Sequence, residues 1–209
     1  MVYKNLFYRL IFSLFFLLIF FVSLHEKYLL FIFGTCIYFF VLYEILKYFN
    51  KSFKLILIYF FSSYFCFIIY FFIFYDYLIF NIFVFTIIFL DSFSYFTGKL
   101  FGKNNIFKFI SPKKTLEGYL GGIFFTNTLF IFYFNFYYTE IVFTKFIILI
   151  NLIIFISIIG DLIESYFKRI NNIKDSSKFL PGHGGYFDRF DSFIASIIML
   201  TIFSFLINL

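Results

Sequence analysis

Long unbroken apolar runs, divided by short polar stretches, are the feature that most constrains how this chain can fold. The sequence is 63% hydrophobic, with 44 Phe, and only 13% of its residues are charged. A soluble domain carries roughly 25% charged residues, and so few charges cannot cover a surface that faces water. The runs do not alternate, and they are too long for the strands of a membrane barrel. The pattern predicts an all-α, polytopic membrane protein with one integral membrane domain over residues 1–209.

A membrane-spanning helix needs about 20 mostly apolar residues, and seven segments meet this requirement. Asp76 alone divides the third segment from the fourth. The first apolar run, Leu10 to Leu24, follows Lys4 and Arg9 as the apolar part of a signal peptide would. No small-residue cleavage site follows it, and more spans come after it, which favours a retained span. We expect about seven transmembrane helices, at residues 6–24, 28–46, 55–75, 77–97, 119–138, 141–163 and 191–209.

The distribution of basic residues predicts the orientation. With seven spans, 15 of the 17 Lys and Arg fall on one side of the membrane, and only Lys27 and Lys145 fall on the other. Because Lys and Arg are enriched in cytoplasmic loops, the N-terminus and both long polar loops are expected to be cytoplasmic, in the cell (inner) membrane. The net charge of +6 then reflects topology, and we expect no nucleic-acid partner. Cys36 and Cys66 lie in apolar runs and are interpreted as packing residues.

The first polar loop region, residues 91–122, contains a predicted helix start. In SPKKTLEG, Ser111 is expected to cap the helix and Pro112 to take its first position. Lys113 and Lys114 would then oppose the helix dipole, which a purely structural cap would avoid. A phosphate site explains them, because two ammonium groups and the free backbone N–H groups would converge on one anion. The alternative interpretation is an ordinary basic loop followed by a capped helix.

The second polar loop region, residues 161–192, holds 10 of the 28 charged residues. Four of its polar residues are spaced so that they share one face of a helix, and acids at a membrane helix end are costly and usually functional. Asp188 and Asp191 either cap the last helix or supply oxygen ligands for Mg²⁺. In the second case acids of the shared face would complete a two-ion site. The four residues of the shared face are Asp161, Glu164, Ser165 and Lys168.

Glycines mark two places where backbone is expected to come close to another group. Gly98 and Gly102 are four residues apart, which allows close helix packing. In LPGHGG, glycines surround His183 and let backbone approach a ligand. A lone His is more often structural than catalytic, but its position beside acids and bases favours function. The remaining residues of this motif are Pro181, Gly182, Gly184 and Gly185.

Residues 165–191 resemble the long C-terminal motif of the phosphatidate cytidylyltransferase family, the CDP-diacylglycerol synthases. Residues 91–103 and 111–118 are also similar to family elements, in the expected order. The chain departs from the family at Leu116, where Trp is usual, and at Ser92, where Thr is common, and it is expected to be reduced at its N-terminus. The motif residues are Ser165, Lys168, Arg169, Lys174, Asp175, Pro181, His183, Gly184, Gly185, Asp188, Arg189 and Asp191.

The resemblance implies an enzyme of phospholipid biosynthesis that converts CTP and phosphatidate to CDP-diacylglycerol and pyrophosphate. It also implies Mg²⁺, with a monovalent cation such as K⁺ as a second ion. The lipid bilayer holds one substrate and water the other, so a polar site at cytoplasmic helix ends would let them meet. The metal ligands implied are Asp161, Glu164, Asp188 and Asp191. The catalytic residues implied are Lys168, Arg169, Lys174, Asp175, His183 and Arg189, and the substrate-binding residues are Ser111, Lys113, Lys114, Ser165, Gly184 and Gly185.

Three other functions are compatible with parts of the pattern. A CTP-dependent polyprenol or dolichol kinase would release CDP and a lipid phosphate. A transporter would place its acids at mid-membrane depth along an ion path, whereas most acids here cluster with bases and glycines. An inactive remnant would not be expected to retain these charged residues. Whether the protein forms a homodimer stays open.

Overall fold

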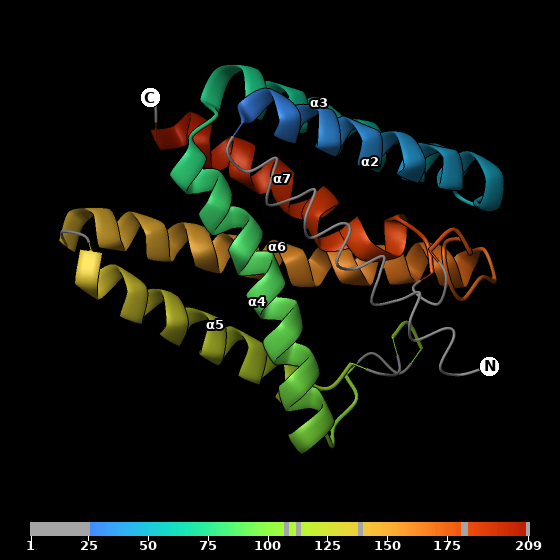
Figure 1. Cartoon of the computed structure of the whole chain (residues 1–209). Coiled ribbons are helices and arrows are strands. Elements are labelled where there is room, and N and C mark those ends of the chain that lie inside the picture. Colours follow the sequence, from blue (N-terminus) through green and yellow to red (C-terminus); the bar gives the residue numbers. More distant parts are fainter. Residues whose placement is uncertain (1–25, 107–108, 112–113, 138–139, 181–183, 208–209) are drawn as a thin grey trace.

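The protein is a bundle of long helices, seen in a computed structural model that describes residues 26–106, 109–111, 114–137, 140–180 and 184–207 (Figure 1). In that part of the chain, β structure is limited to two isolated bridges, which pair Asn105 with Thr115 and Leu180 with Gly184. The helices are α2 (Lys27–Tyr48), α3 (Phe53–Ile69) with its π-helical continuation η1 (Tyr70–Phe74), α4 (Tyr77–Phe101), α5 (Leu116–Tyr137), α6 (Glu140–Ile170) and α7 (Phe187–Ile207).

The predicted membrane architecture is confirmed in the described part of the chain. Five segments there are long and apolar enough to cross a membrane, and they are Lys27–Tyr48, Phe53–Phe74, Tyr77–Phe101, Phe143–Ile170 and Phe187–Ile207. The predicted span at 6–24 lies outside the described residues. Helix α5 forms where the span at 119–138 was predicted, but it is not among the five, and its sequence includes three Gly and two Asn. A count of seven spans therefore stays a prediction.

The boundary between the third and fourth predicted spans is confirmed at Asp76. Its Oδ1 accepts a hydrogen bond from the backbone N of Ile79 at 2.9 Å and so caps α4. The chain leaves helical geometry after Phe74 and re-enters it at Tyr77. One acid between two long apolar runs thus ends one helix and begins the next.

The predicted start of α5 is wrong by one helical turn. The helix begins at Leu116, not beside Ser111, and its cap is Thr115, whose Oγ1 accepts from the backbone N of Gly118 at 3.2 Å. Ser111 instead forms a turn in which its carbonyl accepts from the N of Lys114 at 3.2 Å. Both hydroxyl residues satisfy the local capping pattern, and contacts with the end of α4 decide between them.

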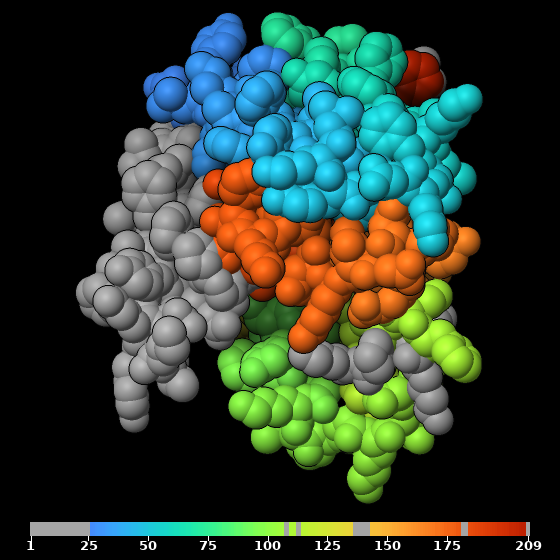
Figure 2. Space-filling view, turned by 90° about the vertical axis from the view of Figure 1, so that its right-hand side faces the viewer, coloured from blue at the N-terminus to red at the C-terminus, as the bar shows by residue number. Residues whose placement is uncertain are grey.

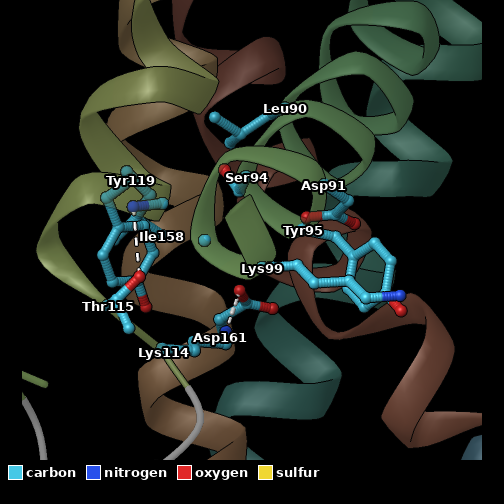
Figure 3. Close-up of a pocket in the computed structure, with 12 residues that line it drawn as sticks. Leu90, Asp91, Ser94, Tyr95, Lys99, Lys114, Thr115, Tyr119, Ile158 and Asp161 are labelled. Atoms are coloured by element: carbon cyan, nitrogen blue, oxygen red, sulfur yellow. Dashed lines mark hydrogen bonds and ion pairs between the residues drawn. The ribbon is translucent and has the colours of Figure 1, made fainter. Parts of the chain in front are cut away.

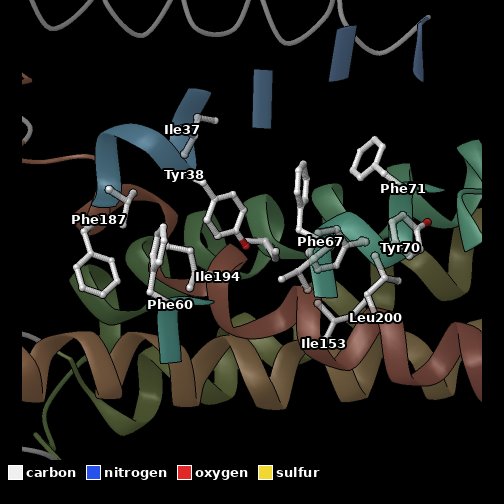
Figure 4. Close-up of a cluster of buried hydrophobic side chains, with 14 of the residues drawn as sticks. Ile37, Tyr38, Phe60, Phe67, Tyr70, Phe71, Ile153, Phe187, Ile194 and Leu200 are labelled. Carbon is white, nitrogen blue, oxygen red and sulfur yellow. The ribbon is translucent and has the colours of Figure 1, made fainter. Parts of the chain in front are cut away.

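Two buried apolar clusters hold the helices together. The larger one joins α2, α3 and α7, where Tyr38, Phe67 and Ile194 lie side by side (Figure 4). A buried chain of hydrogen bonds runs through it, because Tyr38 Oη lies 2.5 Å from Ser63 Oγ, which donates to the Ile194 carbonyl at 2.6 Å. The smaller cluster joins α4, α5 and α6 and contains Ile82, Leu90, Phe130, Phe134, Ile150 and Ile154.

The outer surface of the bundle is apolar. Phe39 is 68% exposed, Ile58 71% and Phe132 68%, and such large side chains recur along the outward faces of most helices. A surface of this kind is stable against lipid tails but not against water. The protein is therefore a multi-pass membrane protein.

Glycines allow the helices that carry the polar loops to pack closely. The predicted contact at Gly98 is confirmed, because an added Cβ there would lie 3.2 Å from Thr115 Oγ1 and 3.5 Å from the Cα of Gly118 on the facing helix. Gly160 allows a similarly close contact between α6 and α7, where an added Cβ would lie 2.5 Å from the Cβ of Ala195. In lipid, where both helices face apolar surroundings, such close backbone approach drives association.

Candidate active site

Both polar loop regions lie at one end of the bundle, beside the turn between α2 and α3 (Figure 2). The Nε of Arg169 at the end of α6 donates to the carbonyl of Ile110 in the first loop at 3.1 Å. Asn171 accepts from the backbone N of Lys51 at 2.7 Å and so attaches the α2–α3 turn. Lys27 lies at the other end, with its Nζ 5.4 Å from the ring centre of Tyr75. The basic loops are thus separated from Lys27 as predicted.

A cluster of acids and a lysine forms where α6 meets α7. The predicted shared face of α6 is confirmed for Glu164 and Lys168, whose Oε2 and Nζ are 2.6 Å apart. Lys168 Nζ also lies 2.7 Å from Oδ1 of Asp188 on α7. Ser192 brings the other two acids near each other, since its Oγ donates to Asp161 Oδ1 at 3.1 Å and its N donates to Asp191 Oδ1 at 2.9 Å.

Asp188 organises the loop that precedes α7. Its Oδ2 accepts from the backbone N of Ser176 and from the N of Gly185, both at 2.8 Å, and lies 3.0 Å from Ser176 Oγ. Gly184 adopts φ +85°, and a Cβ there would lie 2.5 Å from Asp188 Oδ2. Gly184 of the predicted motif is therefore required by its positive φ and by the close approach of the loop to this carboxylate.

The first loop supplies a cation to the acids of α6. Lys114 Nζ forms an ion pair with Asp161 Oδ2. Burial by itself would lower the pKa of the Lys114 ammonium, but the charge of Asp161 opposes this and the pKa is raised above its usual value. Lys114 is thus held in its charged form next to an acid that the sequence places 47 residues away.

A cavity of about 350 Å³ opens beside this pair (Figure 3), and we call it the polar cavity because four charged residues contribute to its lining. Figure 3 shows Lys114 and Asp161 together on one wall, and the α4 residues Asp91 and Lys99 contribute another part of the lining. Both cationic and acidic side chains face the same space, as a site for a metal-bound phosphate requires. The remaining lining residues are Leu90, Ser94, Tyr95, Gly98, Thr115, Gly118, Tyr119 and Ile158.

Other residues predicted for the site lie around it or outside the described residues. Ser165 is buried on α6, and Arg189 lines a neighbouring apolar cavity. Lys174 and Asp175 are exposed on the second loop, where Asp175 Cβ lies 3.6 Å from the position of a Cβ on Gly184. His183 and Lys113 lie outside the described residues, as do Pro181 and Gly182.

The predicted metal ligands are Asp161, Glu164, Asp188 and Asp191, all on α6 and α7. In the described ranges, no group of three or more His, Cys, Asp or Glu residues has the geometry to hold a metal ion. Asp161 is instead paired with Lys114, and Glu164 and Asp188 are paired with Lys168. One buried oxygen, Oε1 of Glu164, has no hydrogen-bond partner, and an orphaned carboxylate oxygen beside other acids fits a cation.

Two acids near the site were not among the site residues predicted from the sequence. Glu44, near the end of the predicted span at 28–46, is fully buried and accepts hydrogen bonds from the second loop. Asp91 lines the polar cavity and the neighbouring apolar one. The signal that could have found Glu44 is its position, because a lone ionisable residue within an apolar span is costly unless it has partners.

Similar curated sequences include three that are called phosphatidate cytidylyltransferase. The one from Haemophilus influenzae is 40% identical over 121 residues, which are 56% of this chain and 42% of that protein. The one from Staphylococcus aureus is 41% identical over 114 residues, which are 54% of this chain and 43% of that protein. The one from Staphylococcus saprophyticus is 40% identical over 119 residues, which are 54% of this chain and 43% of that protein.

The matched segments therefore span less than half the length of each of these relatives. A wider match comes from a family model described as "Cytidylyltransferase family", which covers residues 2–207. This range includes both polar loop regions and every helix described above. The chain belongs to the cytidylyltransferase family.

Proposed function

We propose that this protein is a CTP:phosphatidate cytidylyltransferase. An oxygen of the phosphatidate phosphate attacks the α-phosphorus of CTP, the bond between the α-phosphorus and the bridging oxygen breaks, and pyrophosphate leaves. The observation that carries the proposal is the meeting of Lys114 from the first loop with Asp161 from the second region at one polar cavity. The names of the relatives support the choice of nucleotide and lipid.

Charge neutralisation and positioning are the main tasks of such a site, because both reactants are anions. Lys114 and Lys99 line the cavity and are placed to meet phosphate oxygens, while Lys168 neutralises the adjacent acids. The phosphate of phosphatidate is ionised at neutral pH, so the attacking oxygen needs no general base. We accordingly propose that His183 and Lys113 position phosphate groups, and that Arg169, Lys174 and Arg189 contribute positive charge around them.

The proposed metal ligands are Asp161, Asp191 and Glu164. Ser192 contacts the first two, and the third has the orphaned oxygen. When bound, Mg²⁺ would supply charge to the triphosphate as a Lewis acid. Asp188 stays a proposed ligand, although its contacts with Lys168 and the loop favour a positioning role. K⁺ is proposed as the second ion.

A second cavity suits the lipid. It measures about 320 Å³, lies among α2, α3, α4 and α7, and shares Asp91 with the polar cavity. Its walls are apolar apart from Asp91 and Arg189, and they include Phe33, Phe67, Phe80 and Phe193. We propose that part of a phosphatidate acyl chain occupies it while the phosphate lies at the polar cavity. We further propose that this end of the bundle faces the cytoplasm, where CTP is available.

The test uses the full chain purified in detergent, with phosphatidate, CTP labelled in its α-phosphate, and Mg²⁺. We expect label in the lipid fraction together with released pyrophosphate. Asp161→Asn should abolish transfer, whereas Asp76→Asn removes a charge at the distant α4 cap and should retain it, since Asn also caps helices. Phosphorylation of an added lipid alcohol with release of CDP would replace this proposal with a lipid kinase. Folded protein with no turnover of CTP would contradict both enzymatic functions.

A further inference from the structure

Glu44 is a buried acid on α2 whose partners all belong to the second loop and the start of α7. Its side chain has no exposed surface. The carboxylate accepts hydrogen bonds from Ser176 Oγ at 2.9 Å and Ser177 Oγ at 2.6 Å, and from the backbone N of Tyr186 at 2.8 Å and of Phe187 at 2.9 Å. These partners are at least 132 residues away in the sequence.

The last two contacts make Glu44 a cap for another helix. Phe187 is the first residue of α7, and the first N–H groups of a helix have no partner within it. A carboxylate at that end also interacts favourably with the helix dipole. In the described ranges, no Lys or Arg lies within ion-pair distance of Glu44. Hydrogen bonds from the loop and α7 therefore compensate for burying this acid.

Ser176 connects Glu44 to the candidate site. Its hydroxyl lies 2.9 Å from Glu44 Oε2 and 3.0 Å from Asp188 Oδ2, and Asp188 in turn pairs with Lys168. Gly185 lies between these groups with no room for a side chain, since a Cβ there would be 2.0 Å from Ser176 Oγ and 2.6 Å from either Glu44 oxygen. The loop is thus held between a carboxylate of α2 and a carboxylate of α7.

We propose that Glu44 is a positioning residue for the proposed cytidylyl transfer, on which this inference rests. It contacts neither substrate. It fixes Ser176 and Ser177 of the second loop and the first turn of α7, and through Ser176 it orients Asp188 and hence Lys168. The polar cavity and the second loop would then keep their relative geometry only while α2 supplies this carboxylate.

The kinetic test compares Glu44→Gln with Tyr38→Phe in the full chain. Gln keeps the size of the side chain but turns an NH₂ group towards one of the four donors. We expect kcat to fall by roughly tenfold or more, because small displacements of catalytic groups have effects of that order. Tyr38→Phe removes a buried hydrogen bond of the same helix, to Ser63, and should leave kcat within about twofold. Glu44→Asp keeps the charge and should recover part of the loss.

A second measurement does not depend on activity. Cleavage by a lysine-specific protease after the exposed Lys174 and Lys178 should become several-fold faster in Glu44→Gln, while cleavage after Lys51 stays unchanged. If the wild type does not transfer cytidylate but the loop is loosened in the variant, the proposed function fails and the structural role of Glu44 stands. A kcat within twofold of wild type, an equal loss in Tyr38→Phe, or unchanged cleavage after Lys174 and Lys178 would each overturn the inference.

Discussion

The Nζ of Lys168 on α6 and the Oδ1 of Asp188 on α7 lie 2.7 Å apart, and this ion pair joins the two helices that carry the second polar region. The same Nζ lies 2.6 Å from Oε2 of Glu164, so one cation serves two buried acids. Lys168 is 13% exposed, Glu164 1% and Asp188 10%. Solvent therefore screens this ion pair little, and removing Lys168 leaves two acids without their cation.

Lys168→Met should destabilise the protein strongly. Removing one partner from a buried pair costs about 3–5 kcal/mol, because the remaining charge is uncompensated. The measurement is unfolding in mixed detergent micelles. Lys178→Met is the matched control, since Lys178 is an exposed lysine of the second loop, and it should change stability by no more than about 0.5 kcal/mol. Equal stability of the two variants would contradict the role given to Lys168.

Gly184→Ala should cost more than Gly98→Ala. Gly184 has φ +85°, and a left-handed conformation costs an L-residue roughly 1–2 kcal/mol. The added Cβ would also lie 2.5 Å from Asp188 Oδ2, whereas at Gly98 its nearest contact is 3.2 Å. Unfolding of both variants in the same micelles tests this, and a smaller loss at Gly184 would show that the loop has another conformation.

Gly160→Ala should separate α6 from α7, and a second change should restore part of the contact. The added Cβ would lie 2.5 Å from Ala195 Cβ and 2.9 Å from the carbonyl oxygen of Asp191. Overpacking of this kind costs about 1–3 kcal/mol. Ala195→Gly removes the nearer atom, so the double variant should be more stable than the sum of the single changes. A double-mutant cycle with strictly additive losses would rule out this contact.

Glu117 should contribute stability that depends on pH. Hydrogen bonds from the backbone N of Lys103 and of Asn104 lower the pKa of the Glu117 carboxyl below its usual value. A lowered pKa stabilises the fold above the ordinary Glu pKa, near pH 4.5, and this contribution is lost as the pH falls through the folded-state pKa. Glu117→Gln should therefore lower the unfolding temperature at pH 7 and have less effect under strongly acidic conditions. A difference that does not change with pH would contradict the assignment.

Part of the fold follows directly from local patterns. The apolar runs predicted the positions of the long helices, and Asp76 predicted the break between α3 with η1 and α4. The spacing of Glu164 and Lys168 predicted that they share one face of α6, where they form an ion pair, because residues four apart on a helix are neighbours. Ser111 shows the limit of such patterns, since it satisfies the capping rule as well as Thr115 does but does not cap α5.

The sequence by itself determined that this chain is a helical membrane protein with two polar loops, because hydrophobic length and helical periodicity are local properties. It also determined which residue types are available for anions and cations. Only the tertiary structure decided that Lys114 meets Asp161 and that Glu44 caps α7. Those partners lie 47 and 143 residues apart, and only the packing of the helices in three dimensions brings them together, which no local pattern encodes.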